Sequence, residues 1–145
     1  MYDLWRMDAL NELQAYNARR QALENIPARI AELEEALTAI RSSTSDGSPV
    51  KGGGSGREDA LLNNIVARDN LKASLERTKE AVERTERGLR ALNDDDRRIL
   101  ECFFISPRKG AATQLASELR IEEKTVYNRR NNALHLFQIA MSGDM

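Results

Sequence analysis

The side chains best suited to specific chemistry lie near the end of the chain, on a helix expected to begin at about Glu123. They carry cations, amides or a hydroxyl, groups that bond nucleic acid, and they are Lys124, Thr125, Asn128, Arg129, Arg130 and Asn132. Asn can bond adenine through two atoms and Arg can do so with guanine, so Thr125, Asn128 and Arg129 are expected to meet base edges. Lys124, Arg130 and Asn132 are better placed for phosphates. Arg108 and Lys109, ahead of the preceding helix, are further phosphate candidates. The pattern therefore predicts a site for double-stranded DNA.

The sequence offers no credible site for catalysis or for a metal ion. His135 is the single histidine and has no partner in view. Cys102 lies in an apolar run, so we expect a buried small hydrophobic residue rather than a reactive thiol. Lys51 comes before the glycines at 52–54, whereas a P-loop has the opposite order, and no strand precedes them. We therefore expect no enzyme, no cofactor and no metal site.

The overall charge limits how nucleic acid could be bound. The chain has 145 residues, with 22 Lys and Arg against 23 Asp and Glu, and its net charge is −1. A chain with this balance has no general affinity for DNA, so any contact must come from a local patch. The single Cys excludes an internal disulfide and suits a reducing compartment. No signal-like segment and no run of about 18 apolar residues is present, so we expect a cytoplasmic protein without a membrane partner.

The elements that must position these side chains are expected to be helices throughout. Aromatic residues make up 5% of the chain, and Ala, Leu, Glu and Arg dominate, which is typical of long helices and coiled coils. The first long helix is expected over residues 1–41, where apolar positions from Leu23 onward alternate three and four apart. Pro27 interrupts it, and the alternatives are a kink or a stop and restart capped by Asn25; the unbroken apolar seam favours the kink. The second long helix, over residues 57–92, repeats the same spacing from Leu71.

Residues 42–56 join these two helices and read as a flexible linker, because Ser and Gly dominate them. Two helices of similar length on such a link predict an antiparallel, coiled-coil-like hairpin. The seam is thin, with Thr78 and Thr85 at core positions, so we expect it to be shared with a second chain in a homodimer.

A separate three-helix domain of the helix-turn-helix type is expected over residues 93–141. Asn93 and the three aspartates after it are a strong helix start, and that helix should end at Ser106 and Pro107. A short helix is expected over about 111–119, then a turn at 120–122, then a last helix that runs from about 123 to 137 or a little beyond. The apolar stripe of the last helix consists of Val126, Ala133, Leu134 and Phe137.

From Leu115 to Leu136 the sequence resembles region 4 of sigma factors, the helix-turn-helix that reads the upstream promoter element. The positions that carry the resemblance are Ala116, Leu119, Ile121, Thr125, Val126, Arg129, Ala133 and Leu134. Small phage and prophage regulators are built on the same module, and the order of long helices, Ser/Gly link and sigma-like end is similar to their late-gene activator families. The resemblance implies sequence-specific DNA binding, a role in transcription regulation and, as a further expectation, contact with RNA polymerase.

Two positions depart from that family. Its members often have Gly or Asn where this chain has Arg120, because the turn favours a left-handed residue. They also often have Ser where Glu122 or Glu123 stands, at the cap of the last helix.

Two other functions remain open at this point. A small terminase-like subunit for DNA packaging also joins a helix-turn-helix to oligomerising helices. A coiled-coil interaction protein without DNA binding would use the long helices alone, with the C-terminal helices as a structural unit.

Overall fold

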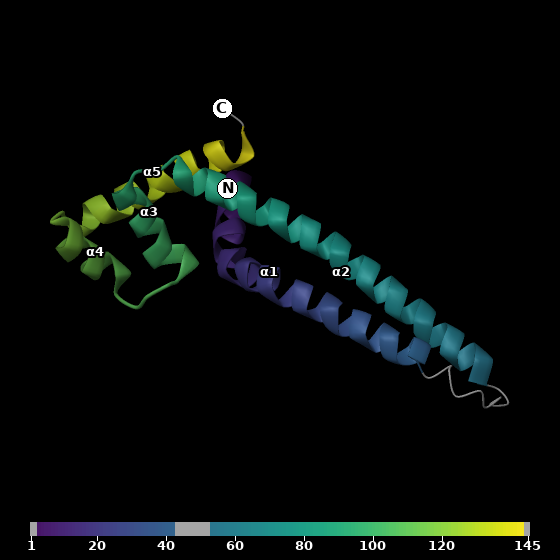
Figure 1. The fold of residues 1–145 in the computed structure, drawn as a ribbon. Helices are drawn as coiled ribbons and strands as arrows, with labels where there is room; N and C mark the ends of the chain where they lie inside the picture. Colours follow the sequence, from purple (N-terminus) through teal and green to yellow (C-terminus); the bar gives the residue numbers. More distant parts are fainter. Residues whose placement is uncertain (1–2, 43–52, 144–145) are drawn as a thin grey trace. The chain divides into compact units, whose positions relative to one another are not determined.

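The computed structural model describes residues 3–42 and 53–143, and every regular element in those ranges is helical. The long helices are α1 (Leu4–Ser42) and α2 (Gly53–Arg90), and the shorter ones are α3 (Asp94–Leu100), the π-helical turn η2 (Glu101–Ile105), α4 (Ala111–Leu119) and α5 (Glu123–Ser142) (Figure 1). The predicted all-α class is confirmed. The chain divides into two compact units: Met1–Arg20 with Glu80–Met145, and Gln21–Lys79.

Helix α1 runs without a break through Pro27, so the expected alternative of a stop and restart at Asn25 is wrong. Proline removes one backbone donor and crowds the carbonyl four residues earlier. The helix tolerates this because the apolar positions on both sides of Pro27 lie on the same face. The half-buried Leu23, Ile26 and Ile30 mark that face.

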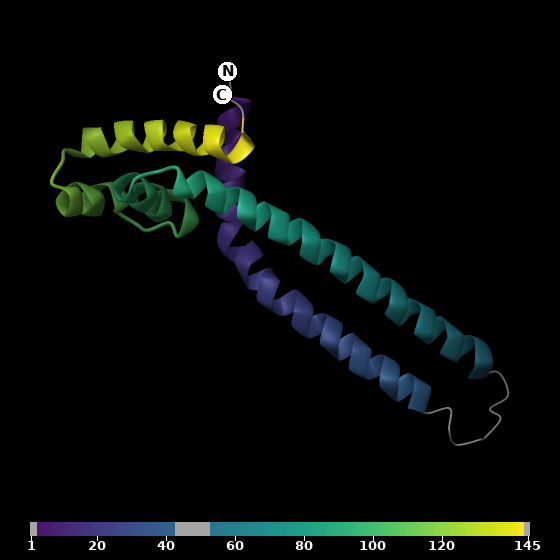
Figure 2. The ribbon, with the colours of Figure 1, turned by 45° about the horizontal axis from the view of Figure 1, so that its top comes forward.

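The unit of residues 21–79 consists of one stretch of α1 and one stretch of α2, which run side by side in opposite directions (Figures 1 and 2). Leu37 and Asn64 are the buried side chains among its described residues. The Asn64 Nδ2 donates to the Leu33 carbonyl at 2.7 Å, and the Arg68 Nε donates to the Asn64 Oδ1 at 2.9 Å. A polar residue that is bonded at one point in an apolar seam fixes the register of the two helices.

The linker was expected over residues 42–56, but the structure places both ends of this range in helices. Ser42 ends α1, and the backbone from Gly53 to Gly56 already belongs to α2. The rest of the predicted linker, residues 43–52, lies outside the described residues.

The other unit joins both ends of the chain around one apolar core. This core draws on α1, α2, α3 and α5, and its buried members are Ala9, Leu13, Leu89, Leu92, Leu100, Ala133, Leu134, Phe137 and Met141. Polar contacts support the same packing, since the Gln138 Nε2 donates to the Asp8 Oδ2 at 3.1 Å and the Arg87 guanidinium donates to the Met141 carbonyl at 3.2 Å. The second half of α5 therefore packs on α1 and α2 within this unit.

A second, smaller core lies beneath the helices that carry the predicted DNA-contacting residues. It joins α3, η2, α4 and the start of α5, and its buried members are Ile99, Cys102, Ala111, Leu115 and Val126. Partly buried side chains complete it, namely Phe103, Ala116, Leu119 and Ile121. These two cores fix α5 along its whole length, which determines the face that it turns to solvent.

Candidate nucleic-acid interface

The acidic start of α3 forms as its sequence predicts. The Asn93 Oδ1 accepts from the Asp96 amide at 2.8 Å, which satisfies one of the free amides of the first turn. Asp94, Asp95 and Asp96 occupy that turn, where the helix dipole favours negative charge. The helix passes into η2, and the bond from the Ser106 amide to the Glu101 carbonyl at 2.8 Å closes it.

Helix α4 begins at a glycine and ends at a strained residue. Gly110 takes left-handed angles before the first residue of α4, and no side chain caps the amides that follow it. Arg120 ends α4 at φ 58° and ψ 47°, also left-handed. The Ile121 amide donates to the Ala116 carbonyl at 3.1 Å, which directs the chain sharply toward α5.

The first turn of α5 has no conventional cap. Glu122 precedes the helix in extended conformation, and its side chain makes no capping bond. The neighbouring Glu123 instead accepts a hydrogen bond from the Thr113 hydroxyl at 2.6 Å, which links α5 to α4. Glu122 therefore leaves the first amides of α5 without a side-chain cap, and Glu123 serves as a cross-link to α4.

The buried stripe of α5 is the one that the sequence predicts, extended by one residue. Its members are Val126, Ala133, Leu134, Phe137 and Met141. Residues in a helix turn by about 100° each, so the opposite face carries Lys124, Asn128 and Asn132. All three are exposed, and Thr125 beside them is half-buried. Four of the six polar residues predicted on this helix thus share one accessible surface.

Arg129 was expected to meet a base, but its guanidinium is held within the chain. The Nη2 lies 3.0 Å from the Asp96 Oδ1, the Nε donates to the same oxygen at 3.2 Å, and the Nη1 lies 3.9 Å from the Asp95 Oδ2. The side chain is 29% exposed. Arg129 therefore ties α5 to the acidic start of α3.

Arg130 was expected to meet a phosphate, and it too has partners within the chain. Its guanidinium carbon lies 5.1 Å from the Phe103 ring centre and 5.0 Å from that of Tyr127. A cation at this distance is attracted to the face of an aromatic ring. Arg130 therefore covers the aromatic edge of the smaller core, and sequence spacing gave no sign of this contact.

The remaining cations are free of ion pairs in the described part of the chain. Arg108, Lys109, Arg120 and Lys124 are all exposed, and none has a carboxylate within 4 Å there. Most of the other arginines that follow Asn93 are paired with acids, as Arg97 is with Asp94 at 3.2 Å. The unpaired positive charge is therefore concentrated before α4, in the turn after it and at the start of α5.

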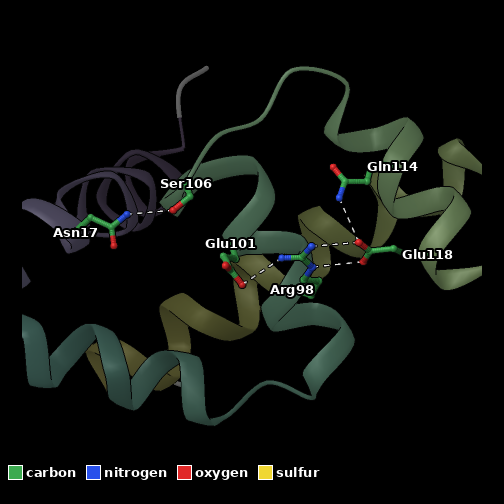
Figure 3. A network of polar contacts seen from close by, with 6 residues as sticks. All are labelled: Asn17, Arg98, Glu101, Ser106, Gln114 and Glu118. Carbon is green, nitrogen blue, oxygen red and sulfur yellow. Dashed lines mark hydrogen bonds and ion pairs between the residues drawn. The ribbon is translucent and has the colours of Figure 1, made fainter.

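Figure 3 shows the contacts that hold α4 and the loop before it. The Arg98 guanidinium lies 3.1 Å from the Glu118 Oε1, and the Gln114 Nε2 donates to that oxygen at 3.2 Å. The hydrogen bond from Arg98 lowers the pKa of Glu118, and the same bond raises the pKa of Arg98. This pair favours the charged form of Glu118 and holds its carboxylate against Arg98 of α3.

The start of the loop that carries Arg108 and Lys109 is fixed by α1. The Asn17 Nδ2 donates to the Ser106 Oγ at 3.1 Å (Figure 3). The same nitrogen donates to the Ile105 carbonyl, also at 3.1 Å. The Arg108 amide also donates to the Cys102 carbonyl at 3.2 Å. Sequence reasoning missed Asn17, because it lies 88 residues before its partner and no local pattern marks it.

The other two residues whose side chains could take part in catalysis, Cys102 and His135, pack against neighbouring side chains. Burial raises the pKa of the Cys102 thiol, which disfavours the reactive thiolate. The ring of His135 lies 4.9 Å from that of Trp5. Over residues 3–42 and 53–143, no group of three or more His, Cys, Asp or Glu side chains could hold a metal ion. Within the same residues, no helix is both long enough and apolar enough to cross a membrane.

Comparison with known proteins adds no relative to these observations: no protein-family model, no curated protein and no solved structure matches the chain.

Proposed function

We propose that this chain is a sequence-specific DNA-binding protein, in which α4, the turn at Arg120 and α5 act as a helix-turn-helix. The observation that carries the proposal is the outward face of α5. Lys124, Asn128 and Asn132 are exposed there, directly opposite the stripe that anchors the helix to both cores. A helix held in this way can enter the major groove without any rearrangement of its buried side.

The early residues of a recognition helix meet base edges, so Asn128 and Thr125 are the proposed base readers. An Asn amide can donate to and accept from adenine at once. Lys124 and Asn132 on the same face would bond the phosphates beside the groove. Arg108 and Lys109 would hold the phosphates on the far side of α4, where the uncapped first amides of that helix also favour an anion.

Arg129 and Arg130 take a different part in this proposal from the one that the sequence favoured. Each is held by partners on α3, η2 or α5, so a DNA contact would require the loss of the bond to Asp96 or of the stack on Phe103. We assign them to holding α5 in place. The resemblance to sigma region 4 supports a regulator of transcription that contacts RNA polymerase, and both of these roles belong to the proposal.

The test is a binding titration with duplexes selected from a random DNA pool, read by fluorescence anisotropy. The double variant Lys124→Ala with Asn128→Ala should lose at least about tenfold in affinity, because it removes the Asn128 base contact, which contributes roughly 1–3 kcal/mol, and the Lys124 phosphate contact. The matched control, Lys79→Ala with Asn70→Ala, removes the same two side-chain types from the exposed surface of α2 and should bind like the wild type.

Salt dependence separates phosphate contacts from base contacts in the same assay. Log affinity falls as log salt rises. In the variant Arg108→Ala with Lys109→Ala this slope should become less steep by about two, one for each lost phosphate contact. Selection of no preferred sequence, or undiminished binding by the α5 double variant, would contradict the proposal.

A further inference from the structure

A small apolar patch lies on α2 in the unit of residues 21–79, on the side that α1 does not cover. Leu62 is 58% exposed, Ile65 39% and Val66 47%. Asn64, which bonds the α1 backbone, marks the side that faces α1. Leu62 and Val66 are each two positions from Asn64, so they lie about 160° away from it around the helix. These three neighbouring side chains form a small exposed apolar patch on α2.

Two charges of opposite sign lie at equal distances along α2 on either side of Ile65. Glu58 lies seven residues before Ile65 and Lys72 lies seven residues after it. Seven residues are close to two helical turns, so both charges lie on the same side of α2 as Ile65. Both are exposed, and neither makes an ion pair in the described residues.

We propose that the α2 patch binds the same patch of a second copy of this chain, with the two α2 helices antiparallel and Ile65 at the two-fold axis. In such a pair each surface must complement itself. Two Ile65 side chains then meet, and Leu62 of each copy lies beside them. Glu58 of each copy faces Lys72 of the other, so two ion pairs form, one at each end of the patch.

This surface differs from the one that the sequence suggested. The apolar seam expected to be shared between two chains lies between α1 and α2, where the Asn64 Nδ2 donates to the Leu33 carbonyl. The stripe on α2 that includes Glu58, Ile65 and Lys72 is a separate face. Its apolar area is small, so the dimer is weak and depends on concentration.

Sedimentation velocity over a range of protein concentrations, without DNA, tests the pairing independently of the proposed function. The wild type should shift from monomer to dimer, and Ile65→Glu should raise the dimer Kd at least tenfold. Ile65 is partly exposed, so the variant should retain its helix content by circular dichroism. Leu4→Glu, at an exposed leucine of α1 outside this unit, is the matched control and should dimerise like the wild type.

Charge reversal identifies the partner as a second copy. Glu58→Lys alone and Lys72→Glu alone should each raise the Kd about tenfold, since each replaces two attractive pairs by two repulsive ones. The combined variant restores both pairs and should return to the wild-type Kd. Failure of the combined variant to recover, or a wild type that stays monomeric at every concentration, would overturn the proposal.

Cross-linking tests the register. Under mild oxidation, Ile65→Cys should give a disulfide-linked dimer, because its two copies meet at the axis. In the same register the two copies of Ala73→Cys lie about 24 Å apart along the helices, at 1.5 Å per residue, and should not cross-link. Preferential cross-linking of the Ala73→Cys variant would exclude the proposed arrangement.

Discussion

At the level of single residues, Arg120 shows how a turn can impose its geometry on an unsuitable side chain. The tight connection from α4 to α5 needs a left-handed residue, and Arg120 takes that conformation at φ 58°. For a residue with a Cβ this costs about 1–2 kcal/mol. The resemblance to sigma region 4 led us to expect this strain, because members of that family often have Gly or Asn where this chain has Arg120.

Replacement of Arg120 by Gly should therefore stabilise the protein by about 1 kcal/mol, less the small entropy that Gly adds to the unfolded chain. Urea unfolding followed by circular dichroism measures the change. Arg120→Ala is the matched control, because it removes the same side chain and keeps the strain, so it should bring no gain. Equal stability of the two variants would show that the side chain, and not the backbone, determines the effect.

The contacts that Arg129 and Arg130 make within the chain could not be predicted from the sequence. Asp96 lies 33 residues before Arg129, and the sequence presents it only as part of a helix start. Phe103 lies on η2, whose π-helical turn changes the direction of the aromatic side chains in a way that apolar spacing does not show. Lys124 and Asn128 were predictable because the buried stripe of α5 fixes the opposite face.

At the level of elements, local signals were enough for the short helices. The observed bounds of α4, Ala111–Leu119, are the predicted ones, since Gly110 and Arg120 interrupt the chain on either side. The start of α5 at Glu123 also agrees with the prediction. How α2 crosses α5 depends instead on one glycine, Gly88, whose role no local pattern reveals.

Gly88 lies inside α2, where Ala would normally stabilise a helix by up to about 1 kcal/mol. Here a Cβ would lie 2.6 Å from two ring carbons of Phe137 and 3.0 Å from the Phe137 carbonyl oxygen. We therefore expect Gly88→Ala to destabilise the protein by about 1–3 kcal/mol, measured by urea unfolding, because α2 and α5 must move apart.

Gly56 is the matched control, because it lies in the same helix with nothing within 4 Å of its added Cβ. Gly56→Ala should stabilise or leave unchanged the helix that Gly88→Ala disrupts. If both changes stabilised the protein, the close approach of α2 and α5 would not exist in solution.

At the level of the whole molecule, the sequence predicts a domain that begins at residue 93, and in the structure the first part of α1 shares a core with α5. Ala9 and Leu13 belong to the same core as Phe137 and Met141. Helical periodicity shows that a helix has an apolar face but not which other helix covers it. The partners here are more than 120 residues apart in sequence, so no local signal identifies them.

Leu13 therefore tests whether the C-terminal helices depend on the beginning of the chain. Its side chain is fully buried, so Leu13→Ala should cost about 2–5 kcal/mol. Native-state hydrogen exchange should show lost protection in α1 and also in the second half of α5, because one core holds both. Leu4→Ala, at a leucine that is 81% exposed, should change neither. If α5 kept its full protection in Leu13→Ala, the helices after Asn93 would be stable without α1, as the sequence alone suggested.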